Sequence, residues 1–329
     1  MSLRLTKRKA LLQGYTLPET EKKATLLLKF QPLRRFDKIG SMQIALASVP
    51  SVWGRSTIKQ FYSEMAALPV DIVYVGETVC SEREVLSPAD YKEIAALLKQ
   101  SGKKVFISTL TLMTSSEQFN KTQELISIGY GVEANSIGVL NLQNEHLAIG
   151  SSLNIYNKES AKWFADFGAE RAILPVELAA KSIAEIAKNV PVEVWAFGNI
   201  PCSISWRCYT ARALDISQPE CRKKCLKYPQ GMVLENVENE NLFIIDGKQI
   251  LSGKTLSLIT QLEELRKIGV ETIRIAPDIK HTKDIVNLFK QVIDNKKDAK
   301  EAEEELKKYA KYGLSNGWFN GEAGIKCYK

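Results

Sequence analysis

Histidine is nearly absent from this chain, which has only His146 and His281 among its 329 residues. A Ser–His or Cys–His catalytic unit and a histidine-rich metal site are therefore hard to build. The motifs G-x-S-x-G and H-E-x-x-H do not occur, and no G-x-G-x-x-G or Walker motif follows the first expected strand. These absences argue against an active peptidase and against a nucleotide-binding fold.

Long hydrophobic runs are also missing. The longest candidates, near Val70–Val75 and Ala172–Val176, are the size of strands, whereas a membrane span needs roughly 18 apolar residues. No secretory signal is visible at the N-terminus. We therefore expect a cytoplasmic protein without a transmembrane segment. Hydrophobic residues make up 45% of the chain, which is enough for a packed core.

Excess charge is confined to one end of the chain. The formal net charge is +7, and residues 1–41 contain ten of the basic residues but only three acidic ones. Residues 42–329 then have 35 of each sign and offer no electrostatic argument for nucleic acid. We expect residues 1–41 to be a basic extension, disordered or produced by a misassigned upstream start codon. A tail that touches lipid or a partner, or an organelle transit peptide, stays open.

From residue 42 onward, strand-like and helix-like patterns alternate about every 25–30 residues. Strands are expected at 42–49, 71–76, 105–109, 130–134, 147–149, 172–176, 192–197, 242–245 and 272–275. Helices are expected at 57–68, 88–100, 115–126, 158–167, 179–189, 256–267 and 282–294. This alternation predicts an α/β fold, a TIM-barrel-like (β/α)-barrel over residues 42–329, with its site at the carboxyl ends of the strands.

Two regions depart from this alternation. Residues 200–230 show no apolar periodicity and contain four of the six cysteines, so we expect a cysteine-bearing insertion there. Residues 296–312 carry dense charges of both signs, which predicts a solvated C-terminal helical tail.

The cysteines predict a metal site. Cys208, Cys221 and Cys225 form a local group whose closely spaced last pair can grip one ion or cluster. Four thiolates are the usual ligands of an iron–sulfur cluster, although they can also hold structural zinc. Only one pair of cysteines is closely spaced in the sequence, whereas zinc sites usually have two such pairs, so an iron–sulfur cluster is favoured over zinc. Burial of the cysteines as small hydrophobic residues is the alternative.

The fourth ligand has two candidates. Cys80 follows the strand expected at 71–76, and the insertion follows the strand expected at 192–197. Both positions fall at the same rim of a barrel, which favours Cys80. Cys202 competes for the role but lies on the same loop as Cys208.

Charged residues near strand ends are candidate catalytic groups. Glu77 and Glu177 each follow an expected strand closely and are candidate carboxylates of the active rim. Arg83 and Arg212 are candidates for holding an anionic donor, because an arginine fork matches a carboxylate. Ordinary ion pairs are the alternative for all four residues.

Several motifs carry a family resemblance over residues 42–329. They are YVGETVCSER at Tyr74–Arg83, ILPVEL at Ile173–Leu178, AFGNIPCSISWRCYTARA at Ala196–Ala213, the Cys221/Cys225 pair, and NGWFNGEAG at Asn316–Gly324. With these motifs the chain resembles the UbiU/UbiV branch of the collagenase-like peptidase family, on the UbiV side of that pair.

The resemblance implies a [4Fe–4S] cluster held by Cys80, Cys208, Cys221 and Cys225. It also implies a heterodimer with a UbiU-like partner that hydroxylates an aromatic quinone precursor in ubiquinone biosynthesis without oxygen, with prephenate as the proposed oxygen donor. Sister branches hydroxylate tRNA or rRNA, so RNA hydroxylation is one alternative. A zinc-stabilised, non-catalytic scaffold is another. The zero net charge of residues 42–329 argues against nucleic acid.

Overall fold

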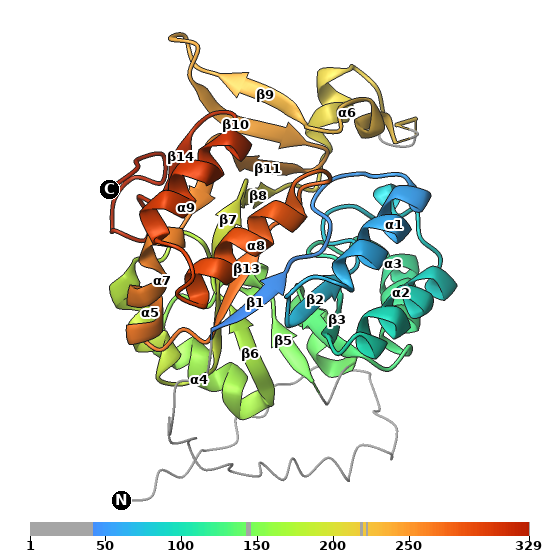
Figure 1. The fold of residues 1–329 in the computed structure, drawn as a ribbon. Coiled ribbons are helices and arrows are strands. Elements are labelled where there is room, and N and C mark those ends of the chain that lie inside the picture. Colours follow the sequence, from blue (N-terminus) through green and yellow to red (C-terminus); the bar gives the residue numbers. More distant parts are fainter. Residues whose placement is uncertain (1–41, 143–145, 218–219, 222, 329) are drawn as a thin grey trace, which may run out of the picture. The chain divides into compact units, whose positions relative to one another are not determined.

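A computed structural model describes residues 42–142, 146–217, 220–221 and 223–328. The expected basic extension at 1–41 lies outside the described residues. Eight parallel strands close into a barrel, because β13 pairs with both β1 and β7 (Figure 1). In spatial order they are β13 (Thr272–Ile275), β1 (Gln43–Leu46), β2 (Ile72–Val75), β3 (Lys104–Ser108), β4 (Gly131–Ala134), β5 (Leu147–Ile149), β6 (Ala169–Ile173) and β7 (Val192–Gly198). The predicted TIM-barrel-like fold is confirmed.

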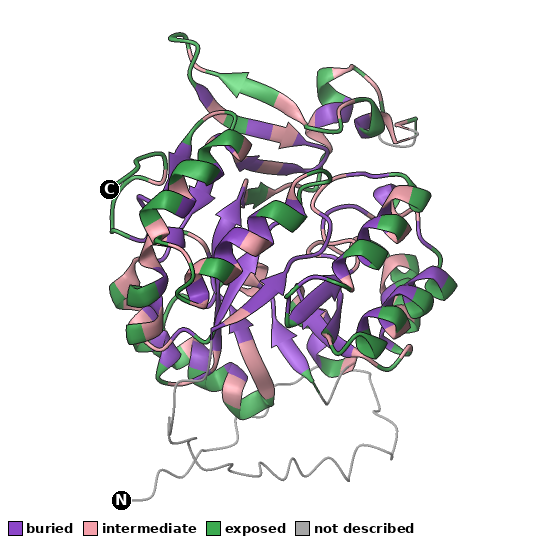
Figure 2. Ribbon diagram, in the orientation of Figure 1, coloured by how far each residue is buried: buried purple, intermediate pink, exposed green. Residues whose placement is uncertain are grey.

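Amphipathic helices surround the barrel with their polar faces outward (Figure 2). They are α1 (Arg55–Met65), α2 (Pro88–Gln100), α3 (Ser116–Ile126), α4 (Lys158–Phe167), α5 (Ala180–Ala187), α7 (Leu262–Lys267) and α8 (Thr282–Ile293). Local signals set their ends: α2 begins with a capping box in which Ser87 and Asp90 bond each other's backbone N–H, and Pro88 fills the first turn. In α8 the buried residues recur at helical spacing and include Ile285, Val286 and Phe289.

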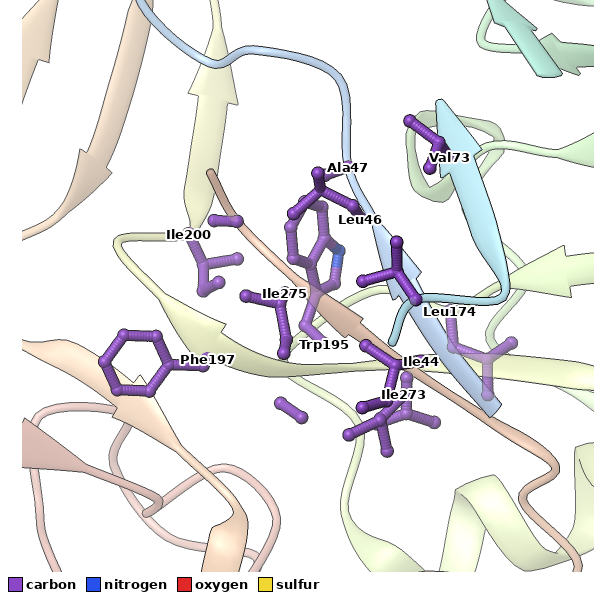
Figure 3. Close-up of a cluster of buried hydrophobic side chains, with 14 of the residues drawn as sticks. Ile44, Leu46, Ala47, Val73, Leu174, Trp195, Phe197, Ile200, Ile273 and Ile275 are labelled. Atoms are coloured by element: carbon purple, nitrogen blue, oxygen red, sulfur yellow. The ribbon is translucent and has the colours of Figure 1, made fainter. Parts of the chain in front are cut away.

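The main apolar core includes outward-facing strand side chains and the buried faces of the helices. Figure 3 shows part of this core, where Ile44 and Leu46 of β1 lie near Ile273 and Ile275 of β13. All four side chains are at most 1% exposed. These strands alternate between apolar residues on the helix-facing side and other residues that point into the barrel.

The barrel interior contains a buried charged network that the sequence analysis did not predict. The Arg274 guanidinium donates to Glu193 Oε1 and to Glu133 Oε1, both at 2.8 Å. It also lies 4.1 Å from the ring centre of Tyr74, whose hydroxyl donates to Glu193 Oε2 at 2.7 Å. Each of these four residues is at most 3% exposed. Ion pairs and hydrogen bonds therefore compensate the buried charges at the barrel centre.

The expected insertion follows the carboxyl end of β7. It forms a four-stranded antiparallel sheet in the order β8 (Pro201–Ile204), β11 (Gln249–Ser252), β10 (Asn241–Asp246) and β9 (Met232–Glu235). The short helix α6 (Tyr209–Ala213) lies beside it (Figure 1). The strand expected at 242–245 belongs to this second sheet rather than to the barrel.

The helix expected at 256–267 is wrong in its first half. Residues Thr255–Ser257 form strand β12, which pairs antiparallel with β7. All three residues of β12 are buried, so pairing with the barrel overrides the leucine spacing that suggested a helix. The helix α7 begins only at Leu262.

The charged tail is helical over a shorter stretch than expected. Helix α9 covers Ala299–Leu306 within the predicted range 296–312. The chain then forms the short strand β14 (Leu314–Ser315), which pairs with β12. None of the described helices combines the length and apolar character that a membrane crossing requires.

Candidate functional site

Four cysteines from distant parts of the chain line one hollow at the rim of the barrel. They are Cys80, after β2, and Cys208, Cys221 and Cys225 of the insertion. The rest of its lining consists of Glu82, Arg83, Lys223, Gly247 and Lys248. Cys80 and Cys225 are buried, whereas Cys208 and Cys221 are half-buried. The structure therefore brings together the four cysteines that the sequence analysis grouped.

The other two cysteines do not belong to this lining. Cys202 lies on β8 and Cys327 lies near the C-terminus, and both are exposed. Cys202 donates a hydrogen bond to the carbonyl oxygen of Ile200 at 3.4 Å. Of the two candidates for a fourth ligand, only Cys80 reaches the hollow.

A carboxylate shapes the loop that positions Cys80. Glu77 Oε1 accepts the backbone N–H of Val79 at 2.7 Å and that of Cys80 at 3.1 Å. Its other oxygen lies 3.3 Å from Arg83 Nε. Glu77 thus has a visible role in holding the loop after β2, because its carboxylate satisfies backbone donors that would otherwise be unpaired.

Local structure also fixes the cysteines of the insertion. Cys208 is the N-cap of α6, and its Sγ accepts the N–H of Ala211 at 3.4 Å. The turn between β10 and β11 holds this helix, since the Gly247 N–H donates to Thr210 Oγ1 at 3.1 Å. Lys223 Nζ donates to the carbonyl of Glu84 at 2.8 Å, which ties the cysteine loop to the loop after β2.

Arg83 is the buried cation of the site and is 3% exposed. Its Nη2 donates to the carbonyl of Pro50 at 2.6 Å, and its Nη1 lies 3.5 Å from Asp246 Oδ2. Burial alone would lower the pKa of Arg83, but the charges of Glu77 and Asp246 outweigh it and leave the pKa raised. Within the described chain, Nε and Nη1 of Arg83 have no hydrogen-bond partner. A charged guanidinium therefore lines the same hollow as the thiols.

Two of the four thiols, Cys80 and Cys225, have a raised pKa. Burial raises the pKa of Cys80, although the positive charge of Lys248 opposes the shift. Burial also raises the pKa of Cys225 to about 11, against the opposing charge of Arg83. Metal ligation requires thiolates, so binding at this site must release protons.

Four thiols are a ligand set that either a structural zinc ion or an iron–sulfur cluster can use. Among the described residues, no group of three His, Cys, Asp or Glu side chains is placed to hold one metal ion. A tetrahedral zinc site with Zn–S bonds of about 2.3 Å needs sulfurs only about 3.8 Å apart. A cubane cluster binds each thiolate to a different iron, so its sulfurs lie farther apart. The four thiols around one hollow match that donor set.

The other two candidate catalytic residues do not line the hollow, although the Arg212 backbone N–H donates to the carbonyl of Cys208 at 3.1 Å. Glu177 is exposed, and its carboxylate accepts a hydrogen bond from the hydroxyl of Tyr156. Arg212 is exposed on α6. Neither residue lines the hollow of the four cysteines. The structure thus places Glu77 and Arg83, but not Glu177 and Arg212, at the candidate site.

A second hollow adjoins the first, and Arg83 lines both. Its walls include Trp53, Glu84 and Tyr91. Burial raises the pKa of Glu84 to about 7, although the Tyr91 hydroxyl donates to its carboxylate and opposes the shift. The sequence analysis missed Glu84. The sequence could have indicated Glu84 as a candidate, because it directly follows the candidate residue Arg83.

The geometry defines a class of protein: a closed (β/α)-barrel with an inserted sheet and a four-cysteine hollow at the carboxyl end of its strands. The chain belongs to peptidase family U32, whose family model matches residues 58–328.

Two curated relatives come from Bacillus subtilis (strain 168). The chain is 22% identical over 290 residues to tRNA hydroxylation protein P1, a match that covers 78% of this chain and 67% of that protein. It is 27% identical over 154 residues to tRNA hydroxylation protein P2, which covers 42% of this chain and 48% of that protein. The second match thus spans about half of its relative.

A solved structure is also similar to this chain. It is a phospho-2-dehydro-3-deoxyheptonate aldolase from Thermotoga maritima, with a TM-score of 0.41 and 11% identity over 81% of this chain and 70% of that one. A likeness at this level carries no argument about function.

Proposed function

We propose that this protein is the iron–sulfur subunit of an oxygen-independent hydroxylase in ubiquinone biosynthesis. The observation that carries the proposal is the convergence of Cys80, Cys208, Cys221 and Cys225 on one hollow. The names of the two relatives support hydroxylation as the reaction class. The UbiU/UbiV-like motifs support an aromatic quinone precursor as substrate and a UbiU-like protein as partner.

These four cysteines would hold a [4Fe–4S] cluster, which supplies one-electron transfer when bound. Arg83, Lys223 and Lys248 line the same hollow and bring positive charge to it. Positive charge favours the more negative reduced state of a cluster, and N–H donors directed at sulfur act in the same direction. Arg83 is buried and lines the hollow, so its charge makes it the main candidate for tuning the site.

The oxygen donor in this proposal is prephenate, which the family resemblance suggests. Prephenate carries two carboxylates, so it would need cationic groups to bind it. Arg83 is not free for this role, because it is buried and already faces Glu77 and Asp246. Arg212 is exposed on α6, so it remains the more accessible candidate for the donor.

Hydroxylation of tRNA is the second candidate function, and the names of both relatives favour it. The equal numbers of acidic and basic residues in 42–329 argue against it, because phosphate recognition normally leaves a basic face. Salt-dependent binding of tRNA by the full chain, with a steep loss of affinity as salt rises, would support this alternative over the quinone precursor.

Anaerobic purification tests the cluster. We expect a brown protein with about four iron and four sulfide ions per chain. Serine variants of Cys80, Cys208, Cys221 and Cys225 should each lose most of the iron, whereas Cys202→Ser and Cys327→Ser are matched controls that keep it. A colourless protein with stoichiometric zinc would instead establish the zinc-stabilised scaffold.

Deletion of the gene tests the pathway. Without oxygen, the deletion strain should accumulate a quinone precursor that lacks a hydroxyl group, and with oxygen it should not. Anaerobic quinone hydroxylation that continues at the normal rate in the deletion strain would refute this function even if the cluster is present.

A further inference from the structure

The four cysteines of the hollow come from two separate parts of the chain. Cys80 lies on the loop after β2 of the barrel, whereas Cys208, Cys221 and Cys225 lie on the insertion. Each thiolate has to lie within bonding distance of the metal group, so the two parts must be held at a fixed separation. The contacts between the insertion and the barrel loops therefore decide whether the site is complete.

The turn between β10 and β11 contacts the barrel loop that follows β1 (Figure 1). Ser51 Oγ donates to Asp246 Oδ2 at 2.8 Å, and Gln249 Nε2 donates to the carbonyl of Pro50 at 2.6 Å. The same Gln249 amide also donates to Asp246 Oδ2 at 2.9 Å. Asp246 and Gln249 are 3% and 1% exposed, and hydrogen bonds are stronger when they are shielded from water. Two buried polar side chains of the insertion thus find their partners on the barrel.

Arg83 extends this junction to the loop that carries Cys80. Its Nη2 donates to the same Pro50 carbonyl at 2.6 Å, and its Nη1 lies 3.5 Å from Asp246 Oδ2. Its Nε faces Glu77, whose carboxylate accepts the backbone N–H of Cys80 at 3.1 Å. A continuous series of contacts therefore connects the turn of the insertion with the backbone of Cys80.

The same turn also contacts the helix that begins after Cys208. The carbonyl of Gly247 accepts the backbone N–H of Tyr209 at 2.9 Å, and the Gly247 N–H donates to Thr210 Oγ1 at 3.1 Å. Gly247 has a φ of +66°, a conformation that favours glycine, and it lines the hollow of the four cysteines. The turn thus bonds both to the barrel loops and to the segment that carries the other cysteines.

We propose that Asp246 and Gln249 of the β10–β11 turn form a clamp that holds the three cysteines of the insertion within bonding range of the metal group bound by Cys80. Neither residue lines the hollow, so both are positioning residues that act through Arg83 and the loop after β1. The inference rests on the proposed function for the identity of the metal group. The clamp itself exists in the metal-free chain and can be tested there.

Thiol labelling of the metal-free full chain is the first test. Asp246→Ala and Gln249→Ala should each raise the rate at which iodoacetamide modifies the buried Cys80 at least about tenfold, because the hollow opens more often. Mass spectrometry of the Cys80 peptide measures this rate, and the exposed Cys202 is the internal reference. Asp246→Asn keeps an oxygen acceptor for Ser51 and should recover most of the protection.

Asn241→Leu is the matched control within the inserted sheet. Asn241 is also a buried polar residue of β10, but its amide donates to the carbonyl of Gly253 and not to a barrel loop. This variant should leave the labelling of Cys80 within about twofold of the unmodified rate. Equal increases for Asn241→Leu and Asp246→Ala would show that any weakening of the inserted sheet exposes Cys80, and would overturn the clamp.

The cluster-loaded protein gives the second readout. Three thiolates retain three irons when the fourth ligand is out of range, so Asp246→Ala should lower the iron content from about four to about three per chain. EPR of the oxidised variant should show a three-iron cluster that the unmodified protein lacks. Asp246→Asn should keep the fourth iron, which a residue with no influence on the ligands of the cluster would not predict.

The outcomes separate this inference from the function on which it rests. If the unmodified chain holds no iron but both alanine variants expose Cys80, the proposed function fails and the clamp stands. If the unmodified chain holds a cluster but both alanine variants label Cys80 no faster, the clamp is wrong and the function stands. Circular dichroism confirms that each variant is folded. Gln249→Ala keeps the pair of Arg83 and Asp246, so it is the milder change should Asp246→Ala unfold.

Discussion

Two buried arginines, one inside the barrel and one beside the cysteines, show how differently the same group is used. Both Arg274 and Arg83 are 3% exposed, and both face two carboxylates. The two ion pairs of Arg274 are 2.8 Å long, and two aromatic rings lie against its guanidinium. The ion pairs of Arg83 are 3.3 and 3.5 Å long. In the described chain, Nε and Nη1 of Arg83 lack a hydrogen-bond partner, and so does Nε of Arg274.

The difference separates a structural charge from one that can serve a ligand. Carboxylates at hydrogen-bonding distance take up the donors of Arg274 that point into the barrel, so its contribution is to stability. Nε and Nη1 of Arg83 face Glu77 and Asp246 at longer distances, and the guanidinium also borders the hollow of the four cysteines. An unsatisfied buried donor is costly unless something else meets it.

Removal of the central arginine should have the largest effect. Arg274→Met leaves Glu133 and Glu193 buried without their cation, so we expect the free energy of unfolding to fall by about 3–5 kcal/mol. Urea denaturation measures this loss. The matched control is Lys188→Met, which breaks an exposed pair with Glu185 and should cost less than about 0.5 kcal/mol. If Arg274→Met lowers the free energy of unfolding by less than about 1 kcal/mol, the charged network does not have the structural role assigned to it.

Arg83→Met should destabilise the protein less, by about 2–3 kcal/mol, because its ion pairs are longer. Its distinguishing effect is on the cluster-loaded protein, whose midpoint potential should fall because a positive charge is lost beside the reduced state. Arg83→Lys keeps the charge and should recover most of the potential. Equal potentials for Arg83→Met and the unmodified protein, measured by redox titration under EPR, would show that Arg83 is only structural.

Glu84 is a largely buried carboxyl, and it should make stability depend on pH. Its pKa is about 7 in the folded chain against an ordinary value of 4.5, mainly because of burial. Between these values the folded chain holds one more proton than the unfolded chain, so stability falls as pH rises from 4.5 to 7. Glu84→Gln removes this fall, and we expect it to be more stable than the unmodified protein by about 1–2 kcal/mol at pH 8.

The same substitution should change little at pH 4, where Glu84 is protonated in both folded and unfolded chains. Thermal melts at both pH values provide the comparison. A stability difference that is the same at pH 4 and pH 8 would mean that Glu84 does not titrate as described.

The smallest effect belongs to an arginine on the surface. Arg55 donates to Asp90 at 2.7 and 2.8 Å, but its side chain is 60% exposed. Solvent screens such a pair, so Arg55→Met should leave the thermal midpoint unchanged within error. A large drop in the thermal midpoint would mean that the geometry of the ion pair, rather than its burial, decides how much each of these three arginines contributes to stability.

The barrel could be predicted because the alternation of strands and helices is a local signal that recurs along the chain. The exception at Leu256 shows the limit of such signals, because that residue lies in a strand through its pairing with β7 and β14. The strand pairing of the inserted sheet could not be predicted from the sequence for a related reason. Its strands are short, and two of its three pairings contain register shifts, at Asn241/Phe243 and at Ile250/Leu251.

The four-cysteine group could be predicted because barrel topology brings the carboxyl ends of parallel strands to one rim. The interior network could not, since each charged residue stands singly in an apolar strand, as Arg274 does in β13. Recognising it requires knowing which strands lie opposite each other across the barrel. A lone charge at an inward position of a buried strand was the signal available.

The strand order has a consequence for how the protein is made. The last strand of the barrel in the chain, β13, lies between β1 and β7 and completes the cylinder. On the ribosome, Cys80 and the cysteines of the insertion all emerge before Thr272 is added. Until then the loop after β2 and the insertion have no closed frame that holds them together. We therefore expect the proposed cluster to be assembled only after the chain has been translated.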